Sequence, residues 1–394
     1  MALWFAFLDH IPGNSLSWLT LRNYGFSDTT EVFFFVSGYT CMVAYGKAQR
    51  EAGWRTATAR AFQCGWEIYR AFLILLLAYL ALVQLLGGTQ ELLDVTNTGV
   101  FFAYPETAIV RSLLFQYSPV NTDVLPTFVL LHTGFPALLW LLSRSLSATL
   151  AGSLLFYLGA RLLDWNLPSW PRGYWYFNPF AWQVLFVFGA WCATNSAACA
   201  KAIARSNAAI LIASLYLAFS LAVVLSWHID AFEALLPQVL LELIYPIDKS
   251  SVSPLRLLHF VALAVVAVRL VPHQWHALIK GPILAMIRCG ENSLPIYCLG
   301  VSLAFIAHVV LTQVYDGFAM QALVSFVGIA LMIVAANIIA WMETLDWLTP
   351  KLRRLWPPLG APASQPSPCG PRRRPHGEVF CELSGGEIGH SHRG

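Results

Sequence analysis

The sequence predicts an all-α protein, a polytopic membrane helical bundle of about ten transmembrane helices of which the first is truncated. Three observations lead to this fold class. Of the 394 residues, 57% are hydrophobic and only 11% are charged, against roughly 25% charged in an average globular domain. Apolar windows of about 20 residues, the length that crosses a bilayer, recur along the chain. Basic residues alternate between rich and poor connecting segments, which predicts both termini in the cytoplasm.

This composition excludes several classes of protein for the whole chain. A soluble protein of this length needs surface charge to stay dispersed, so a cytosolic enzyme, a secreted disulfide scaffold and a nucleic-acid-binding domain are ruled out. The eight cysteines lack paired C-x-x-C spacing, and most fall in apolar stretches where cysteine acts as a small hydrophobe. We therefore expect neither a disulfide framework nor a metal site.

Nine apolar windows are complete and a tenth is short. The complete windows run from Thr30 to Tyr45, Ala71 to Leu86, Val124 to Leu142, Leu146 to Leu163, Phe180 to Asn195, Ala208 to Trp227, Leu255 to Val271, Leu294 to Val314 and Phe318 to Trp341. The tenth, Met1 to His10, spans only about 15 Å as a helix, half of a hydrocarbon core of about 30 Å.

The basic residues orient these spans. With the loop after Tyr45 placed in the cytoplasm, eighteen of the 24 Lys and Arg residues fall on the cytoplasmic side and six outside, as the positive-inside rule predicts. Residues 1–347 then form the transmembrane domain. Residues 348–394 are rich in Pro, Gly, Ser and Arg and are expected to form a disordered cytoplasmic tail.

Ionisable groups near or inside membrane spans are the first candidates for function, because they are costly there. His10 ends the short first helix. Pro12 and Gly13 terminate that helix and leave the imidazole near a polar opening. An imidazole in this position is suited to act as a general base; the alternative is a histidine that only caps the helix. Asp9 is adjacent, but neighbouring helical residues do not face each other, so a Ser/His/Asp relay is not supported.

The other polar candidates have structural alternatives. Glu31 follows Asp28 in a helix-start pattern, which favours capping over catalysis. His132, His259 and His308 occur singly on apolar spans, and each is interpreted as a hydrogen-bonded packing residue rather than a ligand.

Two segments suggest substrate contacts. The cytoplasmic segment from Lys47 to Arg70 carries basic residues among aromatic ones; it is either a docking surface for the phosphates of an anionic donor such as a coenzyme A thioester, or the positive-inside signal alone. One outer loop is crowded with Trp and Tyr, including Trp175 and Tyr176, which either stack on sugar rings or form an interfacial aromatic belt. Asn178 follows Tyr176 by two positions and is included with these candidate acceptor-binding residues.

Several motifs together resemble a known family. The N-terminal match is Asp9-His10-Ile11-Pro12-Gly13-Asn14, continued by Leu19 to Asp28, Glu31 and Phe35 to Tyr39. Further matches are Asp123 to Pro126, Phe177 to Gln183, Phe186 to Ala190 and Asn292 to Cys298. Up to about Trp347, the chain resembles OpgC-type proteins, bacterial inner-membrane proteins associated with succinylation of osmoregulated periplasmic glucans. Phe33 to Tyr39 is also similar to an element of the wider acyltransferase-3 superfamily.

The resemblance implies a ten-span bundle that passes an acyl group from cytoplasmic acyl-CoA, such as succinyl-CoA, to an extracytoplasmic sugar, with no permanently bound cofactor. The family histidine corresponds to His10, and the cytoplasmic arginines to Arg60 and Arg70. The superfamily's arginine about eleven positions before the histidine would precede Met1, so the chain is expected to start downstream of the usual start. Relatives also tend to carry more basic residues where this chain has Gln63, Cys64 and Phe72.

The leading hypothesis is a multi-pass O-acyltransferase of the bacterial inner membrane, in which His10 deprotonates a periplasmic glucan hydroxyl and Arg60 and Arg70 hold donor phosphates. Its partners are the lipid bilayer, acyl-CoA and the glucan, with no nucleic acid. The alternative is a transporter or flippase for a glycan or acyl compound, because many spans with scattered polar residues also suit a substrate pathway. A binding or scaffold protein is a third interpretation.

Overall fold

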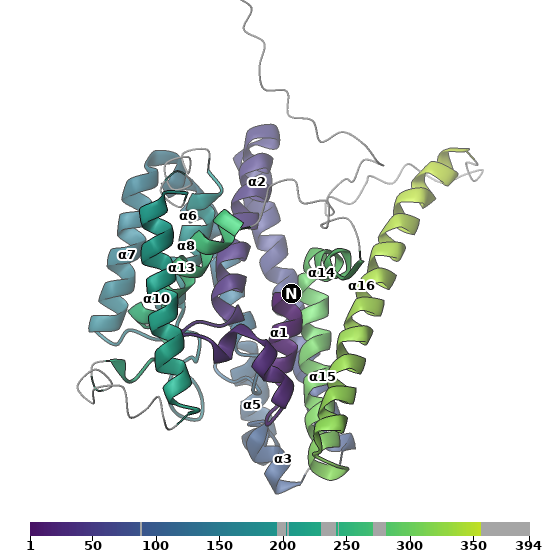
Figure 1. The fold of residues 1–394 in the computed structure, drawn as a ribbon. Helices are drawn as coiled ribbons and strands as arrows, with labels where there is room; N and C mark the ends of the chain where they lie inside the picture. The colour runs from purple at the N-terminus through teal and green to yellow at the C-terminus, as the bar shows by residue number, and fades with distance from the viewer. Residues whose placement is uncertain are drawn as a thin grey trace, which may run out of the picture.

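The computed structural model describes residues 1–86, 89–194, 205–229, 244–270 and 281–355, with residues 202 and 242 described singly. Within these ranges the chain is helical, with no strand (Figure 1). Five of the described helices, α2, α6, α10, α15 and α16, are long and apolar enough to cross a membrane by length and composition. The predicted all-α class is confirmed for the described residues, whereas the count of ten spans and their orientation stay predictions.

Each predicted span coincides with a helix. The predicted spans fall in α1 (Ala2–Asp9), α2 (Thr29–Leu85), α6 (Val124–Arg144), α7 (Leu146–Leu162), α8 (Pro179–Cys192), α10 (Asn207–Ser226), α13 (Pro254–Leu270), α15 (Ser293–Gln313) and α16 (Phe318–Leu355). Helix α14 (Gly281–Glu291) was not predicted. Short elements that were not predicted occupy two loops: η1 (Ser15–Leu19), η2 (Leu21–Asn23), α3 (Gln90–Val95), α4 (Gly99–Ala103) and α5 (Pro105–Leu113). Helix α16 continues eight residues beyond the predicted domain boundary, and the remainder of the predicted tail, 356–394, lies outside the described residues.

Helix α2 contains two predicted spans because it consists of two arms. At Gly53 the backbone is non-helical, with φ 80° and ψ 174°, a conformation that glycine adopts at little cost because it has no Cβ. Cys41 and Tyr45 of the first arm share one buried cluster with Ala57 and Ala61 of the second arm. The two arms therefore pack together and form one central unit.

Two groups of helices flank α2 (Figure 1). Helices α6, α7, α8, α10 and α13 lie on one side, and α1, α14, α15 and α16 lie on the other. The first group approaches α2 very closely, because Gly38 packs on the backbone carbonyl of Phe186 and Gly189 packs reciprocally on that of Phe35. Only a residue without a Cβ fits at these two positions.

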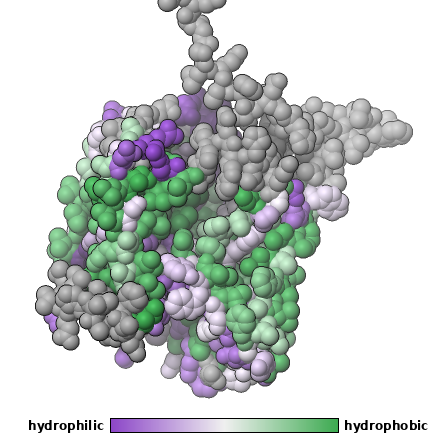
Figure 2. Space-filling view, viewed as in Figure 1, coloured by the Kyte–Doolittle hydropathy of each residue, from purple (hydrophilic) through white to green (hydrophobic). Residues whose placement is uncertain are grey.

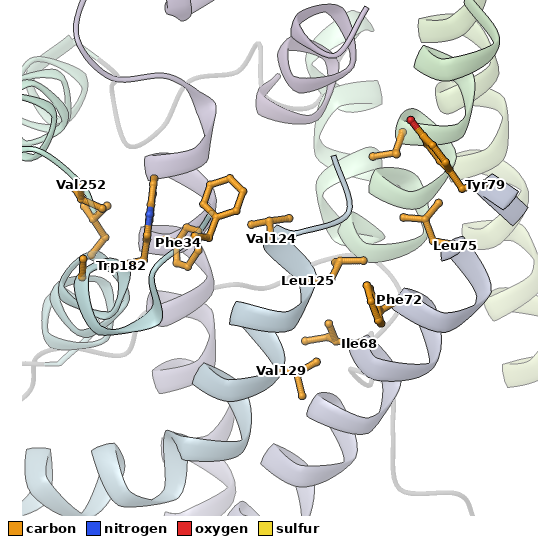
Figure 3. Close-up of a cluster of buried hydrophobic side chains, with 14 of the residues drawn as sticks. Phe34, Ile68, Phe72, Leu75, Tyr79, Val124, Leu125, Val129, Trp182 and Val252 are labelled. Carbon is orange, nitrogen blue, oxygen red and sulfur yellow. The ribbon is translucent and has the colours of Figure 1, made fainter. Parts of the chain in front are cut away.

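The largest buried cluster joins α2 to α6 and α8 (Figure 3). The Phe34 ring lies 4.5 Å from both the Phe128 ring and the Trp182 ring, centroid to centroid. Further along the cluster, Phe72, Leu75 and Tyr79 of the second α2 arm are buried as well. Aromatic packing of this kind holds the helix starts around the outer loops in fixed positions.

The outer surface is strongly apolar (Figure 2). Large hydrophobic side chains on α7, α10 and α16 are well exposed, for example Leu155, Ile212 and Phe326. Patches of this kind are rare on soluble monomers and are typical of surfaces that lipid covers. The surface therefore agrees with a membrane protein.

Loops that were predicted to lie outside meet at one end of the bundle. Ser250 accepts hydrogen bonds at its carbonyl from the Asn178 N–H at 3.1 Å and from the Trp182 indole N–H at 3.0 Å. The Tyr157 hydroxyl donates to the Val252 carbonyl at 2.6 Å, and Trp170 N–H donates to the Gln116 carbonyl at 2.6 Å. Because these contacts join the loops directly, the loops must lie on the same side of the membrane. The predicted alternation of cytoplasmic and outer loops makes the same assignment.

Candidate functional site

A cavity of about 590 Å³ opens where α1 ends. Its walls come from three parts of the chain: residues 9–23, the loop residues 95–96 and 120–121, and the facing surfaces of α2 and α15. The polar lining residues include Asp9, His10, Asn14, Ser15, Ser17, Arg22, Asn23, Thr96, Asn121 and His308, and the aromatic ones are Trp18, Tyr79 and Phe305. A volume in this range suits a small-molecule substrate.

His10 lies at the C-terminal end of α1, where its own backbone N–H closes the helix. The imidazole is partly buried, lines the cavity, and meets the Tyr297 ring edge-on with centroids 6.3 Å apart. Tyr297 is itself anchored by a 2.8 Å hydrogen bond that its hydroxyl donates to the Asn121 carbonyl. This arrangement holds an imidazole at a polar opening, the geometry that a general base requires.

Asp9 lines the same cavity but does not orient the imidazole. Its Oδ1 accepts a 2.7 Å hydrogen bond from the Thr20 hydroxyl, and its backbone carbonyl accepts from Arg22 at 3.5 Å. The carboxylate therefore ties the α1 end to the loop that covers it. The sequence-based expectation that Asp9 and His10 form no relay agrees with this geometry.

Glu31 caps a helix, as the sequence pattern favoured. The Asp28 N–H donates to Glu31 Oε2 at 2.9 Å, and Asp28 Oδ1 accepts from the Thr30 N–H at 2.8 Å, which completes a capping box. Glu31 is fully buried and does not line the cavity. Its position supports a structural role at the start of α2 and not a catalytic one.

A buried charge network that sequence reasoning missed surrounds this helix start. Arg256 donates from Nε to Glu31 Oε1 at 2.8 Å and from Nη2 to Asp28 Oδ2 at 3.1 Å. Lys249 Nζ donates to the same Asp28 oxygen at 2.7 Å. Burial by itself would raise the pKa of Asp28, but the two cations outweigh it and hold that pKa well below its usual range. The sequence offered only one signal for this network: Lys249 and Arg256 are basic residues on the predicted outer side, where few basic residues occur.

Two of the three lone histidines behave as predicted. His132 Nε2 lies 3.0 Å from the Ser37 hydroxyl, and its Nδ1 lies 3.2 Å from the Tyr45 hydroxyl. His259 Nδ1 lies 2.7 Å from the Ser27 hydroxyl. Both are hydrogen-bonded packing residues between helices. His308 differs, because it lines the cavity together with His10.

The candidate acceptor-binding residues lie apart from this cavity. Asn178 is buried and caps α8, accepting from the Phe180 N–H at 3.1 Å and donating to the Trp165 carbonyl at 2.7 Å. Trp175 is also buried, whereas Tyr176 is about half exposed. The geometry gives Asn178 a structural role, and within the part of the chain that the structure describes none of the three lines the cavity that His10 lines.

Arg60 and Arg70 are exposed on the second arm of α2, and their ten-residue spacing corresponds to about 15 Å along the helix. Tyr79, which lines the His10 cavity, follows Arg70 by nine residues, or about 14 Å. Between them, an apolar cavity of about 310 Å³ lies in the seam of α2 and α15, lined by residues such as Ala71, Ala78 and Leu299. This apolar cavity and the His10 cavity therefore both border the second arm of α2.

Among the described residues, no group of three or more His, Cys, Asp or Glu side chains is placed to hold a metal ion.

Comparison with known proteins identifies a family. A family model described as OpgC protein matches residues 1–344. No curated protein and no solved structure matches the chain.

Proposed function

The chain belongs to the OpgC family, and from this premise we propose that it is an O-acyltransferase of the bacterial inner membrane that transfers an acyl group from cytoplasmic acyl-CoA to a hydroxyl of a periplasmic glucan. The family association with succinylation favours succinyl as the acyl group. The observation that carries the proposal is the position of His10, an imidazole that lines a polar cavity at the end where the predicted outer loops meet.

The reaction needs one proton transfer at the acceptor. His10 accepts the proton of the glucan hydroxyl as that oxygen attacks the carbonyl carbon of the thioester. The carbon–sulfur bond breaks, the coenzyme A thiolate leaves, and the proton passes from the imidazole to the sulfur. The products are the glucan ester and free coenzyme A, so atoms and charge balance.

The donor side of the proposal uses the α2–α15 seam. Arginine forks match phosphate oxygens well, and Arg60 and Arg70 are exposed on the α2 arm that leads to the cavity. We assign the phosphates of acyl-CoA to these arginines, and its extended arm to the apolar cavity beside Ala71 and Ala78. The thioester then reaches the level of Tyr79, where the His10 cavity begins.

The test is the substitution His10→Ala in the full chain, with mass analysis of periplasmic glucans from deletion and complemented strains. The expected result is glucan without ester substituents at unchanged glucan abundance, with the variant protein present in the membrane. Thr40→Ala is the matched control, because the Thr40 hydroxyl is exposed and donates only to carbonyls of its own helix. Normal esterification in His10→Ala would refute the role of His10, and loss of glucan itself would favour the transporter alternative.

A further inference from the structure

We propose that His308 is a positioning residue that binds a hydroxyl group of the saccharide acceptor opposite His10. This inference rests on the proposed acyltransfer function and adds an acceptor subsite to it. The sequence assigned His308 to packing, because it occurs alone on an apolar span. The tertiary structure instead brings it to the same cavity as the candidate base.

The two histidines reach the cavity from neighbouring helices. Helix α1 packs on α15, as Figure 1 shows, and His10 contacts Tyr297 of α15. His308 lies one turn beyond Phe305 on the same face of α15. The Phe305 ring packs on the Tyr79 ring at 4.8 Å, and both rings line the cavity. His308 therefore borders an apolar wall, with the polar loop residues as the other walls.

The remaining lining fits a neutral sugar. Asn23 and Asn121 line the cavity with amide side chains, and Trp18 lies at the rim, where it is 40% exposed. A sugar ring presents hydroxyls at its edges and C–H groups on its faces, so it needs this combination of hydrogen-bonding groups and aromatic surface. A neutral imidazole has one donor and one acceptor nitrogen, and it can therefore pair with a hydroxyl in either direction.

Only Asp9 and Arg22 carry charge among the cavity residues that lie near the helix α1 end, and they contact one another through the Asp9 carbonyl. Because these two charges are opposite, this part of the cavity has no net positive charge that would attract an anionic ligand in preference to a neutral one. A neutral saccharide hydroxyl is thus the group that the His308 side of the cavity suits.

The expected kinetic signature is specific to positioning. Removal of one hydrogen bond to the acceptor weakens binding by about 3- to 10-fold. In His308→Ala, the KM for glucan should rise by that factor and the KM for the acyl donor should stay unchanged. His308→Gln keeps a donor and an acceptor, and should restore much of the affinity. Hydrolysis of the donor by water should continue in both variants, whereas His10→Ala should abolish it.

The experiment uses the purified full chain with an unsubstituted glucan oligosaccharide as the probe. Equilibrium binding and KM are measured for the wild type, His308→Ala, His308→Gln and the control Thr312→Ala, whose exposed hydroxyl donates only to carbonyls of its own helix. Equal glucan affinity in the wild type and His308→Ala would overturn the inference, while acylation by the wild type would leave the proposed function intact.

A measurement without substitutions covers the case in which His308→Ala fails to fold. Diethyl pyrocarbonate carbethoxylates accessible imidazoles, and mass spectrometry of peptides reports the modification of His308 in the wild-type chain. Saturating glucan oligosaccharide should slow this modification, and an equal mass of a non-saccharide polymer should not. An unchanged rate with bound glucan would contradict the inference; a chain that binds glucan at His308 but never acylates it would instead refute the proposed function.

Discussion

Arg256 and Glu31 form a buried ion pair across 225 positions of sequence, with the guanidinium Nε donating to Oε1 at 2.8 Å. The pair joins the start of α13 to the start of α2, and Asp28 accepts from the same guanidinium. Water cannot replace either partner of this pair, because Glu31 is fully buried and Arg256 is nearly so. The two helix starts that bracket the outer loops are thereby connected through charges.

Substitution of Arg256 is expected to destabilise the protein strongly. In Arg256→Met, Glu31 is left as a buried carboxylate without its cation, a change that costs about 3 to 5 kcal/mol when one partner of a buried pair is removed. Thermal unfolding of the purified protein in detergent measures the loss. Lys47→Met is the control, because the Lys47–Glu51 pair is exposed at 3.8 Å and contributes about 0 to 1 kcal/mol. Equal stability of the two variants would contradict the importance of the buried pair.

The lowered pKa of Asp28 predicts a specific acid sensitivity. A group whose folded pKa is depressed stabilises the fold above its unfolded pKa of about 3.9, and this contribution is lost as the pH falls toward the folded value. The wild-type unfolding temperature should therefore fall on acidification below about pH 4. Asp28→Asn should be less stable at neutral pH and should show a flatter acid limb. Parallel curves for the two proteins would show that Asp28 is not the responsible group.

The close contact of α2 with α8 predicts a steric effect. In Gly38→Ala, the new Cβ meets the Phe186 carbonyl oxygen, so the helices must separate, at a cost of about 1 to 3 kcal/mol for overpacking. Gly189→Ala should act in the same way, through the Phe35 carbonyl. Gly152→Ala on α7 is the matched control, because no heavy atom lies within 4 Å of its added Cβ. Unfolding temperatures and membrane yield of the three variants test this prediction.

Arg60 and Arg70 should affect the donor and not the acceptor. Loss of a charge-assisted hydrogen bond to a phosphate costs about 1.5 to 3 kcal/mol, so Arg70→Ala should raise the KM for acyl-CoA by roughly 10- to 100-fold and leave the KM for glucan unchanged. Arg70→Lys should recover part of the affinity, since it keeps the charge but not the fork. Arg144→Ala, on α6 beside Trp140, is the control. A shift in the KM for glucan instead would place Arg70 outside the donor site.

Local features explain why much of the fold could be predicted. The apolar windows depend only on neighbouring residues, so each predicted span coincides with a helix. The Asp28 and Glu31 capping box also spans just three positions, and its pattern is readable directly. The sequence predicted a cytoplasmic connection between Tyr45 and Ala71, but not that this connection is helical on both sides of Gly53. Its polar and basic residues interrupt the apolar windows without interrupting the helix.

Distant contacts explain why the candidate site was only partly predictable. The sequence by itself determined the helical membrane class, the positions of the apolar helices, the motif around His10 and the capping role of Glu31. Only the tertiary structure decided that Lys249 and Arg256 close the network at Asp28, that Asn178 is used as a buried helix cap, and that His308 shares a cavity with His10. The physical reason is that lipid and protein interior are both apolar, so the sequence of a membrane helix does not show which face contacts lipid and which contacts protein. The neighbours of a single polar residue are therefore known only once the packing of the helices is known.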